Sequence, residues 1–194
     1  MKRLLAGAFL AFLVAGSIPA MELSIAVAAG PHFPVQEAFR NVYGTAAAFG
    51  LDVRWLATRN IGFSAGVMTL GKRGKAVSLD GGTEDMDVDL KIMSVPLTAY
   101  VHLRRGRFGF DLGAGLAYHD FEETWVDEVG PAVSGRKWGL LACASAGYDI
   151  TPRLSIVGRL RYLDVPTGLA SRLTDKVNLG GFQALVGVSW RVVR

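Results

Sequence analysis

The sequence has very little cysteine and proline and a modest share of charged residues. Cys143 is the single cysteine among 194 residues, so stability has to come from packing and hydrogen bonding without an internal disulfide. Charged residues make up 20% of the chain and hydrophobic residues 51%, which excludes a disordered chain. Seven prolines beside 24 glycines, with no Gly-X-Y period, exclude collagen and suit closely packed strands and turns.

A large excess of charge of either sign is also lacking. The 21 basic and 17 acidic residues give a formal net charge of +4. Without Lys2 and Arg3, which lie in a segment expected to be removed, 19 basic residues face 17 acidic ones and the charge falls to +2. This balance gives no indication of a nucleic-acid partner or of a strongly acidic partner.

Long apolar runs are absent except at the start of the chain. After Lys2 and Arg3, an apolar run covers residues 4–14 and is followed by small residues that end at Ala20. This pattern predicts a secretory signal peptide over residues 1–20, because the run is shorter than the roughly 20 residues of a membrane-spanning helix. Cleavage after Ala20 is preferred over cleavage after Ala28, which would destroy a first strand. The mature chain is then one domain, residues 21–194.

Alternation of apolar with small or polar residues fills most of that domain. It predicts eight strands and no helix longer than a turn; their approximate ranges are 22–29, 42–57, 60–70, 87–104, 107–121, 137–150, 153–164 and 177–192. The connections alternate between tight turns, such as "RRGR", and segments of about a dozen residues, such as "GPHFPVQEAFRN". An even number of strands with this alternation indicates an up-and-down meander with both termini at the short-turn end.

The two faces of the strands differ in a way that favours lipid outside. In "FGFDLGAGLAY", every second residue from Phe108 is apolar, and the residues between are small or acidic. The second face is too poor in Lys, Glu and Thr for a sheet face in water, but it suits a crowded barrel interior. Charges there have to pair. We therefore expect an ion-pair network in the lumen, with a narrow conducting path as the alternative, formed by Asp52, Arg54, Asp111, Asp149, Arg159, Arg161 and Arg191.

Aromatic residues on the apolar face concentrate near the strand ends, as the two interfaces of a membrane select. A soluble lipocalin-like barrel, the alternative, has no reason for this placement. The expected belt near the short turns contains Trp55, Phe63, Phe108, Phe110, Tyr148 and Trp190. The expected belt near the long connections contains Tyr43, Tyr118, Trp138 and Tyr162.

One segment changes its pattern part of the way along. Met93 and the alternate residues after it share the apolar phase, but before it Val88, Leu90 and Ile92 occupy the opposite phase. Either a bulge near Ser94 and Pro96 shifts the register or the upper part is a hairpin extension beyond the bilayer. The sequence leaves both possibilities open.

The stretches "LGAGLAYHDFEE", "YDITPRLSIVGRLRYLDV" and "GVSWRVV" resemble the eight-stranded outer-membrane β-barrel superfamily, which includes OmpX-, OmpW- and opacity-type proteins. The resemblance covers the whole mature chain. It implies an all-β, eight-stranded antiparallel transmembrane barrel in the outer membrane of a Gram-negative bacterium, with outer-membrane lipids and the barrel assembly machinery as partners. Gly187, Trp190 and Val192 match the spacing of the assembly signal in this superfamily, although Val193 and Arg194 follow where its members commonly end on Phe.

The sequence offers weak candidates for chemistry. His119 lies beside Asp120 and near Glu122 and Glu123, and a histidine next to carboxylates can act as a general base. No serine accompanies it at a suitable spacing in the same segment, and the lipid A-modifying members of the superfamily are not matched residue by residue. Acidic residues around 80–89 and 122–128 could hold calcium, but their spacing fits no calcium-loop motif. We therefore expect no catalytic site, metal site or cofactor.

The function that follows is a structural or surface-display role in the cell envelope without catalysis. The first alternative is a small channel or carrier for small or hydrophobic solutes, as OmpW-like relatives suggest. A lipid-modifying barrel enzyme and a soluble lipocalin-like carrier are the remaining possibilities. The protein is expected to be a monomer, and the sequence names no external ligand of the long connections.

Overall fold

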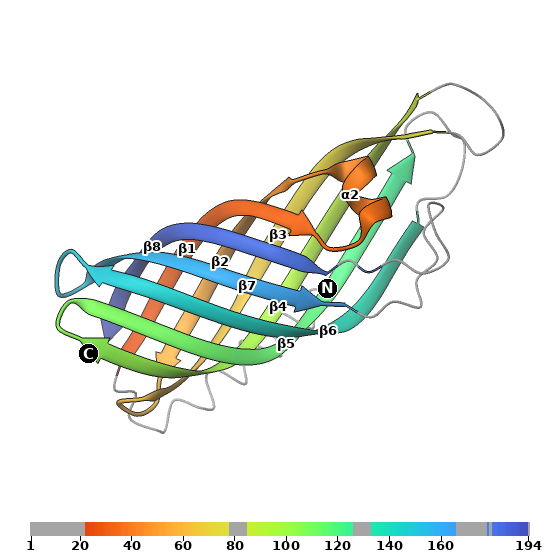
Figure 1. Cartoon of the computed structure of the whole chain (residues 1–194). Helices are drawn as coiled ribbons and strands as arrows, with labels where there is room; N and C mark the ends of the chain where they lie inside the picture. Colours follow the sequence, from red (N-terminus) through yellow and green to blue (C-terminus); the bar gives the residue numbers. More distant parts are fainter. Residues whose placement is uncertain (1–21, 78–84, 126–132, 166–177, 179, 194) are drawn as a thin grey trace.

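The computed structural model describes residues 22–77, 85–125, 133–165, 178 and 180–193. Eight strands in this part of the chain form one closed barrel, in which sequence neighbours pair and the last strand closes onto the first (Figure 1). All of these pairs are antiparallel, which confirms the predicted up-and-down barrel. The strands are β1 (Glu22–Pro34), β2 (Ala46–Leu56), β3 (Ile61–Val77), β4 (Asp85–Arg105), β5 (Phe108–Trp125), β6 (Val133–Asp149), β7 (Leu154–Asp164) and β8 (Gly181–Val193).

The strands are strongly staggered around the barrel. A path from Ser24 that moves from ladder partner to ladder partner returns to β1 at Pro34, a shift of 34 minus 24, or ten residues. The path passes through Arg54, Ser64, Thr98, Gly115, Leu141, Leu163 and Gly181. Stagger and tilt are linked in a closed barrel, and the tilt is typically about 35–45°. Side chains at the same height in the lumen therefore come from different rows of the ladder.

The outside of the barrel is apolar over most of its height. Leu112, Leu160 and Val186 expose 71%, 63% and 67% of their surface. In β5 the exposed residues alternate with half-buried ones from Phe108 onward, so Phe108 and Phe110 face outward and the glycines and Asp111 face the lumen. An apolar exterior around an interior with many polar groups suits a barrel in lipid and is the inverse of a soluble carrier.

The apolar band ends sharply toward the long connections. The rings of Tyr118 and Trp138 are in contact, with their centroids 5.2 Å apart. Two residues further along the same strands, Asp120 and Arg136 form an exposed ion pair of 3.4 Å. Charged pairs of this kind require water, so the boundary between lipid and water lies between these two rows.

Strand β4 continues through this boundary without a bulge. Its register with β5 is unchanged from Val88 to Arg105, past both Ser94 and Pro96. Val88, Leu90 and Ile92 are almost completely buried inside the barrel, and the charged residues between them face outward. The reversed pattern in the sequence is therefore the hairpin extension, where the outside is water and apolar side chains fill the lumen.

The extension also explains why several predicted strands are too short. β3 runs to Val77 rather than 70, β5 runs to Trp125 rather than 121, and β6 begins at Val133 rather than 137. β1 likewise continues to Pro34. The strand ends were predicted from apolar outward residues that alternate with small inward ones. Beyond the membrane the outward residues are polar, so this alternation is lost although the strand continues.

A short helix, α2 (Glu37–Tyr43), follows β1, where the sequence predicted no helix and a strand from residue 42. Phe39 and Tyr43 are one helical turn apart, their ring centroids are 4.6 Å apart, and both are buried. Gly44 ends the helix with a φ of 58°, so β2 begins only at Ala46. The prediction that Tyr43 belongs to a lipid-facing belt is therefore wrong.

No helix among the described residues is long and apolar enough to cross a membrane.

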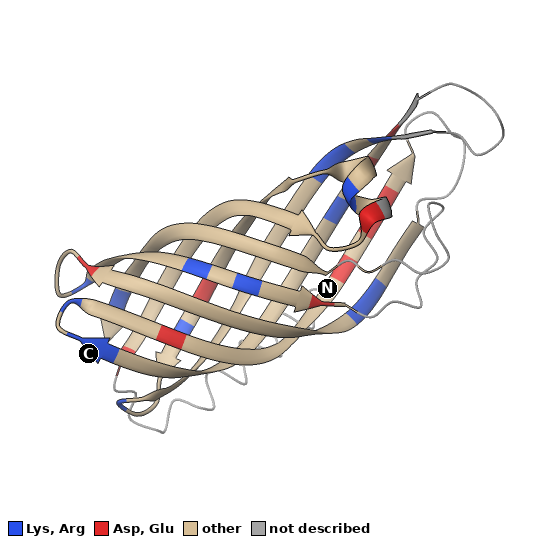
Figure 2. Ribbon diagram, in the orientation of Figure 1, with Lys and Arg blue, Asp and Glu red and all other residues tan. Residues whose placement is uncertain are grey.

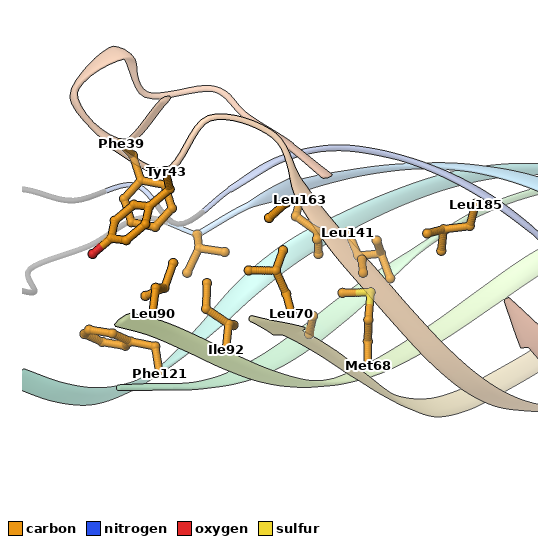
Figure 3. Packing of buried hydrophobic residues seen from close by; sticks show 14 of the residues in the cluster. Phe39, Tyr43, Met68, Leu70, Leu90, Ile92, Phe121, Leu141, Leu163 and Leu185 are labelled. Carbon is orange, nitrogen blue, oxygen red and sulfur yellow. The ribbon is translucent and has the colours of Figure 1, made fainter. Parts of the chain in front are cut away.

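The apolar core occupies the half of the lumen next to the long connections. Four strands contribute inward-pointing side chains, and α2 covers them with Phe39 and Tyr43 (Figure 3); these side chains are Leu70, Leu90, Ile92, Leu141 and Leu163. Leu185 and Met68 extend this core toward the middle of the barrel (Figure 3). The lumen is thus filled by side chains at this end.

Replacing Leu112 by Arg tests the lipid-facing phase. Leu112 lies on the apolar face between the two aromatic rows, so a charge there should reduce the free energy of unfolding in phospholipid vesicles by roughly 2 to 4 kcal/mol. Phe108→Arg, near the interface, is the control and should cost about 0 to 1 kcal/mol. Denaturant unfolding followed by tryptophan fluorescence measures both, and equal losses would contradict the placement of the bilayer.

Candidate functional site

The inward-facing groups near the short turns form a first cluster of ion pairs. Arg191, on β8, lies with its Nε 2.8 Å from Glu22 Oε2 and with its Nη2 3.3 Å from Asp149 Oδ1. Arg104, on β4, also pairs with Asp149, and Ser155 donates a hydrogen bond to Asp149 at 2.6 Å. Several strands are thereby tied together across this opening of the barrel.

A second cluster lies further from the short turns than the first and has Asp111 at its centre. Arg54 Nη2 is 2.5 Å from Asp111 Oδ2, and His102 Nδ1 is 2.7 Å from Asp111 Oδ1. Ser145 donates to the same carboxylate at 2.5 Å. The guanidinium of Arg54 also lies 4.9 Å from the centre of the Tyr100 ring, a cation–π geometry. Asp111 is thus held from three strands.

The third cluster is the most deeply buried. Asp52, on β2, receives hydrogen bonds from Arg159 and Arg161, both on β7, and Arg161 Nη2 is 2.8 Å from Asp52 Oδ1. The three side chains are only 3 to 7% exposed. Arg161 also points its Nη1 toward Met68 Sδ at 3.8 Å. β2 and β7 are not neighbours, so this contact crosses the lumen.

These contacts place all seven residues of the expected lumen network. Each takes part in an ion pair, in the groups Asp52 with Arg159 and Arg161, Arg54 with Asp111, and Asp149 with Arg191. Sequence reasoning missed Glu22, His102 and Arg104 as further members. The alternation of residues predicts that these side chains face inward. Only the register of the strands brings them beside Asp111 and Asp149.

The candidate general base lies inside the barrel wall rather than in a cleft. His119 and Ser94 are each 2% exposed, and His119 Nδ1 is 2.7 Å from Ser94 Oγ. Ser94 stands opposite His119 on the adjacent strand β4, so the spacing of residues within one segment does not reveal this contact. The cavity beside them is about 10 Å³, room for about one water. This pair has no space for a substrate.

The acidic residues near His119 do not gather around it. Asp120 is paired with Arg136 on the outside, and Glu122 is exposed. Glu123 is buried among aromatic residues, where Tyr43 Oη donates to it at 3.3 Å and Trp125 Nε1 donates at 3.0 Å. Burial raises the pKa of the Tyr43 phenol, and the Glu123 carboxylate raises it further.

One acidic residue of the clusters considered for calcium is already paired with a basic side chain. Asp89 is bound by Arg73 through two hydrogen bonds of 2.8 and 3.1 Å. Among the described residues, no three His, Cys, Asp or Glu side chains are placed to hold a metal ion together. Asp80, Glu84, Asp127 and Glu128 lie outside the described residues.

The remaining expected residues are placed as follows. Toward the short turns the rings of Trp55 and Phe63 are in contact, as are those of Phe108 and Tyr148, and Phe110 and Trp190 are exposed. Toward the long connections Tyr118 contacts Trp138, and Tyr162 contacts Phe182, a residue outside the expected belts. In the expected assembly signal, Trp190 and Val192 face outward on β8, and Gly187 lies in the opposite phase. The expected signal peptide, residues 1–20, lies outside the described residues.

The lumen as a whole offers little open space. The cavity among the two clusters nearest the short turns is about 50 Å³, enough for a few waters. Beyond it come the Asp52 cluster and then the apolar core. The arrangement can hold water and rigidify the barrel, and it leaves no room for an organic molecule along the described lumen.

Comparison with known proteins identifies the fold. No protein-family model matches the sequence, and no curated protein sequence matches it. The crystal structure of the outer membrane protein OprG from Pseudomonas aeruginosa matches with a TM-score of 0.71 and 13% identity, over 90% of this chain and 97% of that chain. A major outer membrane protein from Thermus thermophilus matches with a TM-score of 0.59 and 14% identity, over 88% and 98% of the two chains. Neisserial surface protein A matches with a TM-score of 0.56 and 15% identity, over 87% and 95%.

These structures and this chain share one fold at low sequence identity. The barrel is closed, has eight antiparallel strands and exposes an apolar band between two rows of aromatic residues. Fold and surface together are those of a bacterial outer-membrane barrel.

Replacing Asp52 by Asn tests the role of the deepest cluster. The change leaves Arg159 and Arg161 buried without a counter-charge, which should cost about 3 to 5 kcal/mol of unfolding free energy. Asp89→Asn, which breaks the exposed pair with Arg73, is the control and should cost about 0 to 1 kcal/mol. Denaturant unfolding in phospholipid vesicles gives both values. A similar small loss in the two variants would show that the lumen pairs do not stabilise the barrel.

Proposed function

We propose that the protein is an integral outer-membrane protein whose closed barrel anchors its long connections at the outer surface, with no catalysis and no solute passage. The observation that carries this proposal is the filled lumen. Three ion-pair clusters and an apolar core succeed one another along the described part of the barrel. The apolar exterior and the shared fold support the location in the membrane.

The filled lumen favours this role over a channel. The Asp52 cluster bridges β2 and β7 across the barrel axis, so an ion or solute would have to displace buried ion pairs. Beyond this cluster the path narrows to a cavity of about 10 Å³ lined by His32, Leu70, Ile92 and Leu163. An eight-stranded barrel has an interior just wide enough for side chains to fill it.

The same geometry argues against an enzyme that modifies lipid. Such an enzyme needs its nucleophile and base beside the membrane surface, where an ester bond can reach them. His119 and Ser94 instead face the lumen and are covered on all sides. Catalysis would require the barrel wall to open.

Conductance measurements test the absence of a pore. The full mature chain, refolded and inserted into planar lipid bilayers, should show no discrete current steps above the background of the bare membrane. Folding is checked beforehand by heat-modifiable mobility on a gel. Reproducible openings from folded protein would contradict a closed barrel and favour the channel.

Cysteine labelling tests which end faces outward. In a Cys143→Ser background, Glu122→Cys at the long-connection end should react with a membrane-impermeant maleimide on intact cells. Arg59→Cys in the turn between β2 and β3 should react only after the outer membrane is permeabilised. The opposite result would mean that the long connections face the periplasm and would overturn the display role.

A further inference from the structure

Arginine side chains without acidic partners gather at the short-turn end of the barrel. Arg59, Arg105, Arg107 and Arg153 are all exposed, and none forms an ion pair with a described residue. They come from all three short turns, between β2 and β3, β4 and β5, and β6 and β7. Figure 2 shows blue basic segments at the barrel end marked C, and at the opposite end it shows blue segments together with red acidic ones.

The acidic residues at this end are already neutralised. Glu22 and Asp149 are bound by Arg104 and Arg191 inside the barrel mouth. Among the described residues of this rim, these four arginines with Arg104 and Arg191 make six that face two carboxylates, which gives a charge of 6 minus 2, or +4. At the other end, by contrast, basic residues on the outside lie opposite acidic ones, as in the pairs Arg73 with Asp89 and Arg136 with Asp120.

The arginines lie at the edge of the lipid-facing surface. Arg105 is the ladder partner of Phe108, and Arg107 directly precedes Phe108 in the chain. Phe108 contacts Tyr148 with a ring distance of 5.1 Å, and both rings are exposed on the apolar face. Long cationic side chains beside an aromatic row reach the level of the lipid phosphates.

A shallow depression of about 200 Å³ lies between two of these turns. Arg104, Arg107, Ile150, Thr151 and Pro152 line it together with the neutralised Asp149. The two turns are held together because Asp149 N donates a hydrogen bond to the carbonyl oxygen of Arg107 at 2.9 Å. Guanidinium and hydroxyl groups suit a phosphate, and the exposed Ile150 offers an apolar wall beside it.

We propose that this rim, defined by Arg105, Arg107 and the depression at Ile150 to Pro152, binds the phosphate of anionic phospholipids in the periplasmic leaflet. A zwitterionic lipid carries its own cation, which the net positive rim repels, whereas phosphatidylglycerol presents a phosphate without one. The proposal rests on the proposed function, since it requires the short turns to face the periplasm.

Native mass spectrometry of the refolded mature chain in detergent tests the proposal directly. With dioleoyl phosphatidylglycerol and dioleoyl phosphatidylcholine offered at equal concentration, the protein should retain phosphatidylglycerol preferentially. In Arg105→Gln/Arg107→Gln that affinity should fall about fivefold per arginine and about 30-fold in total, at roughly 1 kcal/mol for each cation near a phosphate. Arg40→Gln/Lys91→Gln removes two exposed cations from the other end and should leave the affinity unchanged.

Further arms of the experiment identify the ligand and check the fold. Inorganic phosphate at about 10 mM, well below the roughly 0.1 to 1 M range in which salt strongly screens such contacts, should not displace the lipid, because it lacks the acyl chains that lie along the apolar face. Arg105→Lys/Arg107→Lys should keep most of the preference, since the charge remains. If the double glutamine variant does not fold, the single variants Arg105→Gln and Arg107→Gln replace it, each with an expected loss of about fivefold.

Two results would overturn the site. One is equal retention of both lipids by the unaltered protein, and the other is displacement by inorganic phosphate, which would reduce the site to a simple anion site. Heat-modifiable mobility and cysteine labelling report on the membrane barrel independently, so either result would leave the proposed function standing.

Discussion

In a closed barrel every strand bonds to a neighbour on both sides, because a membrane offers no water to replace a missing backbone partner. This closure fixes the direction in which every side chain points. β4 shows the consequence most clearly, since its register with β5 is unchanged over its length although its surroundings change from lipid to water. Leu97 and Leu103 face lipid, and in the same strand Leu90 faces the lumen. The direction of each side chain is fixed by its position in the strand. The apolar residues therefore move from the outward to the inward phase where the surroundings change from lipid to water.

The same closure makes the lumen small, and in a small lumen charged side chains have to pair with one another. Isolated charges in such a space would be costly, so each carboxylate of the three clusters meets at least one guanidinium from another strand. Asp52 illustrates the arrangement, because its two partners approach from the far side of the barrel. The tilt of the strands brings these residues to one height even though they lie on distant rows of the ladder. Pairing and closure thus reinforce one another.

The sequence predicts what depends on alternation and misses what depends on register. The outward phase of Phe108, Trp138 and Leu160 could be read directly, because two environments select opposite residue types. The helix α2 was not predicted, because Tyr43, Thr45 and Ala47 continue the alternation of the following strand. Only Gly44 marks the end of the helix. The contact of Ser94 with His119 and that of Glu22 with Arg191 join different strands, so no spacing along the chain could reveal them.

Closure also limits where the described part of the protein can meet other molecules. Lipid covers the apolar wall, and side chains fill the lumen, so water-borne contacts are confined to the two ends of the barrel. These ends differ in a physical sense. At one end, hairpin extensions carry ion pairs such as Arg73 with Asp89 into water, and charges there largely satisfy one another. At the other end, no described acidic residue pairs with Arg105 or Arg107, so these arginines need counter-charge from outside the described part of the chain. A lipid phosphate lies at that level in every bilayer, which makes the membrane itself the nearest source of that counter-charge.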